Sequence, residues 1–290
     1  MQKTVGRITG VSTNAFHFPP SVKPYINALQ WSHTYTFQVQ SSTDCRVTFF
    51  TEQQQQNNCD DFARSVEYAL HLLPRMRCPS FTAFIFLTDR VKRLNHPVLG
   101  QDEVNTGYAD RCGTVVIYRK QEWLKVFLHE CIHFFGIDAR FEEPVRLQMF
   151  RVPMEVSLAE TFSEVLARRI NCAVVARFSN QPEEELWATE QNYAIENMVK
   201  VLRAMGFRYD DLFTEYAARH YKERTNVFAY VVLGAILCQS KSFSFQMTPE
   251  AMLRTIYRRC RSAAFLKKVD AASPDHDPIM RMSTVRLFSE

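Results

Sequence analysis

Residues 123–138, WLKVFLHECIHFFGID, contain two histidines four positions apart, with a glutamate directly after the first. Residues four apart on an α-helix lie one turn above each other, so His129 and His133 can reach the same ion. Glu130 is turned about 100° from His129, which suits contact with a water on that ion. The surroundings are apolar, where two unpaired histidines and a glutamate would be costly to bury. The segment therefore predicts a buried helix that binds zinc.

The chemistry expected of this motif is hydrolysis. Zinc lowers the pKa of bound water to about 7, and a glutamate beside it can take the proton as attack begins. Peptide hydrolysis needs this nucleophile together with a Lewis acid for the carbonyl oxygen. The alternative is a chance match in a core helix, which eight histidines in 290 residues would produce in roughly one such chain in a hundred. We therefore predict Glu130 as the general base of a zinc hydrolase.

A third zinc ligand is not found next to the motif. The stretch follows the first part of HExxHxxGxxH, in which the chain turns at the glycine and supplies a third histidine. Ala139 stands at that position, Asp138 lies one position early, and the next histidine is His220. The metzincin pattern therefore fails at its third ligand, and Gly136 is more simply interpreted as the end of the helix.

Two glutamates further along offer the missing ligand. Glu160 and Glu164 lie four residues apart in SLAETFSEVLAR, on one face of a predicted helix. One carboxylate is placed to bind zinc while the other holds the free N–H of a ligand histidine, as is usual in zinc sites. The spacing leaves open which glutamate does which. A competing interpretation is that Ser157 and Glu160 form a capping box at the helix start.

The order of these residues resembles the gluzincin pattern, HExxH followed by ExxxD on the next helix, of thermolysin-like enzymes. The resemblance implies that Glu160 is the third ligand. It implies that Glu164, a glutamate where aspartate is more usual, supports a ligand histidine from behind. It also implies one zinc ion per chain and a zincin-like fold.

Three longer stretches resemble metallopeptidases encoded by large nucleocytoplasmic DNA viruses. They are EVNTGYADRCGTVVIYRKQEWLKVFLHECIHFF (103–135), EVSLAETFSEVLARRIN (155–171) and ERTNVFAYVVLGAIL (223–237). The resemblance covers roughly residues 80–240 and is strongest over 119–133. It implies a viral origin and a gluzincin-like fold, and it supplies no substrate.

Peptide hydrolysis also calls for a donor to the developing oxyanion, expected from the helical half of the chain. His220, Tyr221 and Tyr230 are the candidates. Tyr230 is preferred because it lies in the third of the stretches with the viral resemblance. The alternative for all three is a partly buried side chain whose polar end is satisfied within the fold.

Periodicity outside the motif predicts an α+β fold. TYTFQVQ and CRVTFF predict neighbouring strands, a helix follows from Asp60, and FTAFIFLTD and GTVVIYR predict further strands, with residues 90–110 as loop. GTVVIYR is either a sheet edge that pairs with an extended substrate or an ordinary buried strand. Helical periods dominate after Gly136. We expect a two-lobed zincin-like fold, with residues 1–140 holding a mixed sheet, its edge strand and the HExxH helix. Residues 141–290 would form a helical lobe that supplies the third ligand.

Composition and charge limit the classes of partner and the cellular location that we expect. The net charge of +4 comes from 35 basic and 31 acidic residues that are interspersed, so nucleic acid is not an expected partner. The longest apolar run, Val227–Cys238, is too short to span a membrane as a helix. The N-terminus MQKTVGRITGVST has no signal-peptide core. Eight scattered cysteines without CxxC pairs predict reduced thiols and a cytoplasmic location, which would be the host cytoplasm or the virion if the chain is viral.

The sequence as a whole predicts a zinc-dependent peptidase that acts on peptides or proteins. Its rivals are a non-catalytic virion or host-interaction protein on a zincin scaffold, and a zinc hydrolase that acts on a non-peptide amide. The intact Glu130 favours an enzyme, because a purely structural zinc site would not need it. The sequence leaves open the substrate, internal or terminal cleavage, and the oligomeric state.

Overall fold

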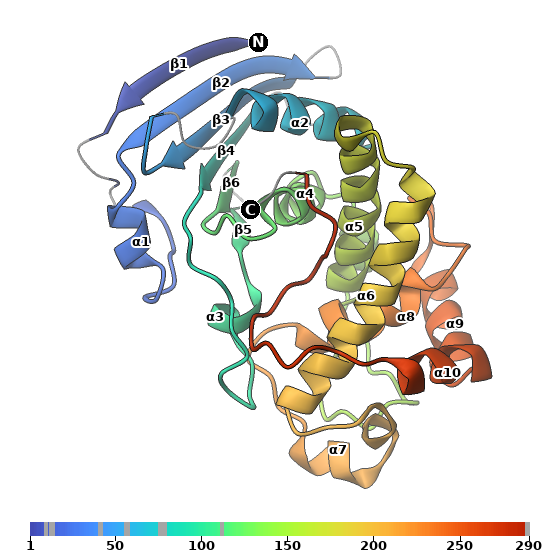
Figure 1. Ribbon diagram of the computed structural model, residues 1–290. Coiled ribbons are helices and arrows are strands. Elements are labelled where there is room, and N and C mark those ends of the chain that lie inside the picture. The colour runs from blue at the N-terminus through green and yellow to red at the C-terminus, as the bar shows by residue number, and fades with distance from the viewer. Residues whose placement is uncertain are drawn as a thin grey trace.

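A computed structural model describes residues 1–8, 11, 15–39, 43–54, 59–74, 80–110 and 113–287. Its sheet has the strand order β1-β2-β3-β4-β6-β5 and stands at the N-terminal side of the molecule (Figure 1). The strands are β1 (Gln2–Arg7), β2 (Trp31–Val39), β3 (Thr43–Thr51), β4 (Ser80–Phe86), β5 (Gly107–Asp110) and β6 (Thr114–Ile117).

The sheet is mixed. β1, β2 and β3 pair antiparallel, β3, β4 and β6 run parallel, and β5 returns antiparallel to β6. The strands predicted from TYTFQVQ, CRVTFF, FTAFIFLTD and GTVVIYR are therefore confirmed. In β2 the prediction rests on the alternation of apolar and polar residues: Tyr35, Phe37 and Val39 are buried, while the residues between them are more exposed. The strand β1 was not predicted, since its six residues show no buried face.

The sequence interpretation of residues 90–110 as loop was wrong over two short elements. A four-residue helix, α3 (Gln101–Val104), leads into β5, whose sequence GYAD has little strand propensity. β5 is a strand because it pairs with β6, Gly107 standing opposite Ile117. The sheet edge is thus β5, and the strand predicted from GTVVIYR lies one place inside it.

Gly107 allows this pairing to be close. A Cβ at that position would lie 2.5 Å from Ile117 Cδ1 and 2.6 Å from the Val116 carbonyl oxygen. Any side chain there would push the edge strand away from β6, so the residue type at Gly107 helps to set the position of β5.

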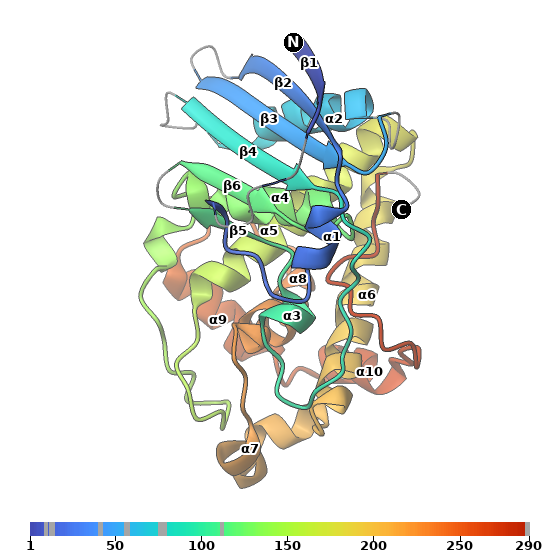
Figure 2. The same cartoon turned by 90° about the vertical axis from the view of Figure 1, so that its left-hand side faces the viewer.

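The two faces of the sheet are covered differently. The helices α2 (Cys59–Leu72) and α4 (Trp123–Phe134) pack on one face and enter the main core. The other face is covered by α1 (Lys23–Asn27) and its flanking residues, which form a small aromatic cluster with the sheet. Figure 2 shows α1 on the side of the sheet away from the helical region. The motif helix α4 is therefore held between sheet and helices, as its apolar sequence predicts.

The rest of the chain is mainly helical, so the fold class is α+β, as predicted. Its α-helices are α5 (Leu158–Ser179), α6 (Glu183–Ala204), α7 (Glu215–His220), α8 (Gly234–Cys238), α9 (Pro249–Arg259) and α10 (Ala263–Ala271). Two 3₁₀ helices (Ala139–Phe141 and Tyr209–Phe213) and a π-helix (Phe228–Leu233) complete the set. In the described part of the chain, no helix has the length and apolar character needed to cross a membrane.

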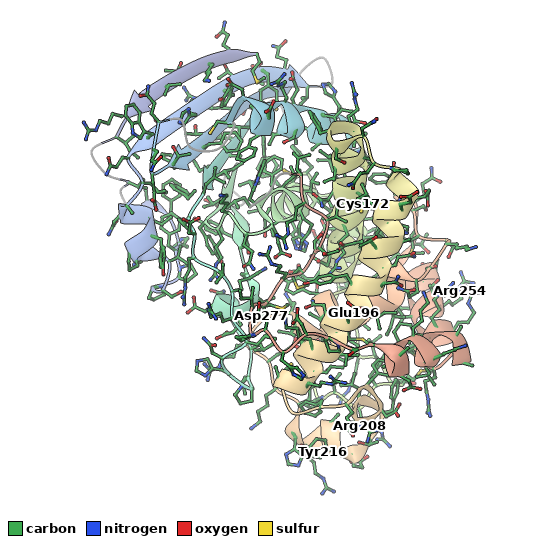
Figure 3. The ribbon with its side chains drawn as sticks, in the orientation of Figure 1. Cys172, Glu196, Arg208, Tyr216, Arg254 and Asp277 are labelled. Atoms are coloured by element: carbon green, nitrogen blue, oxygen red, sulfur yellow. The ribbon has the colours of Figure 1, made fainter. Side chains whose placement is uncertain are left out.

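The last described residues, 278–287, form a C-terminal segment that crosses the molecule. It runs as the red trace between the sheet side and helices α5 and α6 (Figure 1). Asp277, labelled in Figure 3, lies where the segment turns toward the centre. Its backbone bonds to both halves, with Met280 N donating to the Lys92 carbonyl at 3.0 Å and Asn171 Nδ2 donating to the Val285 carbonyl at 2.9 Å. The boundary near residue 140 remains a prediction, and this segment joins the parts on either side of it.

Candidate metal centre

Three side chains from two helices meet at one point. His129 and His133 project from α4, and Glu160 projects from the first turn of α5. Their donor atoms form a triangle: His129 Nε2 to His133 Nε2 is 3.0 Å, His129 Nε2 to Glu160 Oε2 is 3.2 Å, and His133 Nε2 to Glu160 Oε2 is 3.0 Å. Within the described residues this is the group of His, Cys, Asp and Glu side chains with the geometry to hold a metal ion.

The triangle fits zinc. Donor atoms of a tetrahedral site with bonds of about 2.0–2.1 Å lie roughly 3.3 Å from one another. Two imidazole nitrogens and one carboxylate oxygen are a donor set of catalytic zinc sites, which leave the fourth position free for water or substrate. The three residues are thus placed to hold zinc at three corners.

His133 is oriented by a residue that the sequence interpretation passed over. Its Nδ1 lies 2.5 Å from Oδ2 of the buried Asp138, which also accepts from Ser163 Oγ at 3.2 Å. Burial lowers the pKa of His133, but the bonds to Asp138 and Glu160 outweigh it and raise that pKa well above its ordinary value. An Nδ1–H shared with Asp138 turns Nε2 toward the triangle. The signal was present in "GID", where helix α4 ends and Gly136 takes a positive φ of 62°.

Glu164, the glutamate predicted to support a ligand histidine, lies beside His129. Glu164 Oε2 lies 3.3 Å from His129 Nδ1, within ion-pair range, but at an angle outside hydrogen-bond geometry. Lys125 Nζ donates to both Glu164 oxygens, at 3.0 and 2.9 Å, and Arg168 Nε donates to Oε1 at 2.9 Å. Burial raises the pKa of Glu164, but Lys125 and Arg168 lower it well below its ordinary value. Glu164 is therefore a carboxylate held between two cations.

The buried charges continue to the C-terminal segment. Arg168 Nη1 donates to Glu190 Oε1 at 2.8 Å, and Glu190 Oε2 accepts from Ser283 Oγ and from the backbone N–H of Thr284, both at 3.1 Å. Lys125, Glu164, Arg168 and Glu190 are each at most 3% exposed. These four residues, called here the charge chain, connect residue 283 to the motif helix.

Glu160 is not used as the second half of a capping box. Ser157 Oγ does accept from the Glu160 backbone N–H at 3.3 Å, so Ser157 caps α5. The Glu160 carboxylate instead faces the histidines, and Asn226 Nδ2 donates to its Oε1 at 3.1 Å. Burial raises the pKa of Glu160, but the bonds to His129 and His133 outweigh it, so its pKa lies far below the ordinary value. Asn226 was not predicted, because nothing in its local sequence marks it.

Of the three predicted oxyanion donors, one lies at the site. The Tyr230 ring stands edge-on to the His129 ring, with centroids 5.6 Å apart. Burial, followed by the charges of Glu160 and Glu130, raises the pKa of Tyr230 well above its ordinary value. Tyr221 is buried and donates to Glu223 Oε2. His220 packs on Tyr216, which lies at the far tip of the helical region in Figure 3.

Two joined cavities border the triangle. The cleft is lined by Asn105, Gly107, Tyr108, Ala109, His129, Glu130, His133, Glu160 and Tyr230. The inner pocket is much smaller and is lined by Val104, Asn105, Thr106, Gly107, Lys125, Val126, His129, Glu130, Glu164, Tyr230 and Met282. Edge strand β5 therefore forms one wall of the cleft. Burial raises the pKa of Glu130, which lines both cavities, while His129 and His133 lower it.

No family model matches the sequence, and no curated protein matches it. Among solved structures, an aminopeptidase N family protein from Idiomarina loihiensis is similar, with a TM-score of 0.37 and 10% sequence identity. The similarity covers 95% of this chain and 49% of that chain, so this chain spans about half the length of that protein.

Proposed function

We propose that this protein is a zinc-dependent peptidase of gluzincin type. One observation carries the proposal: the donor triangle of His129, His133 and Glu160, the carboxylate of Glu130 and the edge strand β5 all border one cleft. The triangle matches three corners of a zinc site. The edge strand offers a backbone for an extended peptide, which can bind by adding a strand.

The chain's own residues have separate tasks. Zinc in the site would supply a Lewis acid and water activation at neutral pH. Glu130 accepts the proton of the attacking water and passes it to the leaving amine. The phenol of Tyr230 has a raised pKa and stays protonated. It donates to the carbonyl oxygen of the peptide bond that is cut, where negative charge develops. Asp138 and Glu164 hold the histidines in their ligand orientation.

Metal analysis and one variant test the proposal. The purified protein is expected to hold about one zinc per chain, which His129→Ala and His133→Ala remove. Glu130→Gln is expected to keep the zinc and to lose hydrolysis of a peptide library, whereas the exposed Glu142→Gln keeps both. A protein without zinc would overturn the proposal. Zinc binding with no cleavage by the wild type would favour the non-catalytic scaffold.

Origin and location belong to the same proposal. The similarity to metallopeptidases of large nucleocytoplasmic DNA viruses favours a viral chain that works in the host cytoplasm or the virion. Its support is the sequence of residues 103–135, 155–171 and 223–237. Detecting the protein by fractionating infected cells and purified virions tests this part separately from catalysis.

A further inference from the structure

The inner pocket opens from the cleft beside the donor triangle. The two cavities share Gly107, His129 and Glu130 among their linings. A peptide that lies across the triangle along β5 would therefore direct one side chain into the inner pocket. The pocket leads back along α4, from His129 toward Lys125 one turn earlier.

The far end of the inner pocket is close to the His129 ring, on the side of Nδ1. Lys125 Nζ and His129 Nδ1 both contact Glu164 Oε2, at 2.9 and 3.3 Å, so they are at most about 6 Å apart. This distance suits a short side chain better than a long one.

The pocket contains unused hydrogen-bonding capacity. Thr106 is 1% exposed, and its Oγ1 has no hydrogen-bond partner among the described residues. Its backbone is held in place, because the Tyr118 N–H donates to the Thr106 carbonyl at 2.9 Å. Lys125 Nζ carries three N–H donors, and both of its bonds within the described structure go to Glu164. A buried hydroxyl without a partner is uncommon unless a water or a ligand completes it.

The remaining walls limit what enters. Val126 and Met282 line the pocket with apolar surface, and Met282 is held there by the C-terminal segment. The charge of Lys125 is already offset by Glu164. Glu164 also pairs with Arg168, and the charge of Arg168 is offset by Glu190. The charge chain behind the pocket is therefore neutral overall, Thr106 and Lys125 offer donors, and the Glu130 carboxylate stands where the pocket adjoins the cleft. A group with a carbonyl oxygen matches this chemistry.

We propose that the inner pocket is the subsite for a substrate side chain next to the bond that is cut, and that it selects a short side chain ending in a carbonyl oxygen, asparagine or aspartate. Thr106 Oγ1 and Lys125 Nζ donate to that oxygen, and Met282 closes the pocket. The inference rests on the proposed peptidase function and adds its substrate class.

Amino-acid hydroxamates test the subsite without turnover, because the hydroxamate binds the metal and directs its side chain to one place. We would measure the affinity of zinc-loaded protein for the hydroxamates of asparagine, aspartate, alanine and leucine by calorimetry. The expected result is at least tenfold tighter binding of asparagine or aspartate hydroxamate than of the other two. The two favoured probes separate a carboxamide from a carboxylate.

The matched variants are Thr106→Val, which removes the buried hydroxyl, and Thr36→Val, which makes the same change on β2 away from the pocket. Thr106→Val is expected to lower the affinity for the favoured hydroxamates three- to tenfold and to leave alanine hydroxamate unchanged. Thr36→Val is expected to change neither. Equal binding of all four hydroxamates, or a preference that survives Thr106→Val, would overturn the subsite while leaving the metal site intact. Binding of none would overturn the proposed zinc site, and the subsite with it.

Discussion

The two histidines of α4 are supported in opposite ways. His133 Nδ1 contacts Asp138, five residues along the chain, whose other side-chain partner is Ser163. His129 Nδ1 faces Glu164, which belongs to the charge chain that ends at the C-terminal segment. His133 is thus supported mainly by its own turn of the chain, and His129 by residues from three distant segments.

This difference separates metal binding from folding. Loss of the local support should weaken zinc binding at a smaller cost to the apo fold, because Asp138 bonds to His133 and Ser163 and lies outside the charge chain. Loss of the distant support should affect both, because the charge chain is buried and each charge relies on its neighbours.

The largest effect is expected for Glu164→Gln. The substitution leaves Lys125 and Arg168 buried without their shared carboxylate, and breaking such a buried pair costs about 3–5 kcal/mol. Urea unfolding of the apo protein measures this, and zinc affinity should fall about 10–100-fold. Glu184→Gln is the control, since Glu184 is 80% exposed and its pairing should contribute under about 1 kcal/mol. An apo stability unchanged by Glu164→Gln would show that the charge chain does not support the fold.

A smaller loss is expected for Glu190→Gln, at the other end of the charge chain. Arg168 keeps Glu164, while the charged acceptor for residues 283–285 is lost, which costs about 1.5–3 kcal/mol. Limited proteolysis should then cut the C-terminal segment faster than in the wild type, and zinc affinity should fall less than for Glu164→Gln. Wild-type protection of the segment would contradict the idea that Glu190 fastens it.

Asp138→Asn tests the local support. Zinc affinity should fall about 10–100-fold, because the histidine loses its carboxylate partner. The apo protein should lose one charge-assisted hydrogen bond, about 1.5–3 kcal/mol of unfolding free energy, which is less than the loss expected for Glu164→Gln. Competition with a chelator measures the affinity, and the nearby exposed Glu142→Gln is the control. A loss of apo stability as large as that of Glu164→Gln would remove the contrast between the two histidines.

The smallest effect concerns pH and the segment that carries Asn226, whose side chain donates to Glu160. Burial raises the pKa of Glu223 to about 7, although its bonds from Tyr221 and from the Phe228 N–H lower it. This folded-state pKa is above the unfolded value of about 4.3, so its stabilising contribution is complete below pH 4.3 and is lost as pH rises through 7.

Replacing Glu223 by glutamine should remove that pH dependence. Between pH 4.5 and pH 8, the free energy of unfolding of the apo wild type should fall by about 1–2 kcal/mol more than that of Glu223→Gln. Urea unfolding at several pH values measures this difference. Glu215→Gln, an exposed change on α7, should follow the wild type. Parallel stability curves for Glu223→Gln and wild type would show that Glu223 does not titrate as inferred.

Local patterns predicted much of the fold. The alternation in β2, the apolar face of α2 and the helical periods after Gly136 were read correctly, because each depends on neighbours two to four residues away. β1 and β5 were missed because neither has a buried face or strong propensity of its own. They are strands because a neighbouring strand supplies their hydrogen bonds.

Three features of the site are visible in the sequence alone: the spacing of His129 and His133, the i,i+4 pair Glu160 and Glu164, and the apolar residues that bury them. These follow from the fixed geometry of a helix, in which residues four apart share a face. Packing between distant segments brings Glu160 to the triangle, makes β5 the cleft wall and places Met282 of the C-terminal segment in the lining of the inner pocket. Contacts between distant segments depend on how whole elements pack, and local periodicity does not predict that packing.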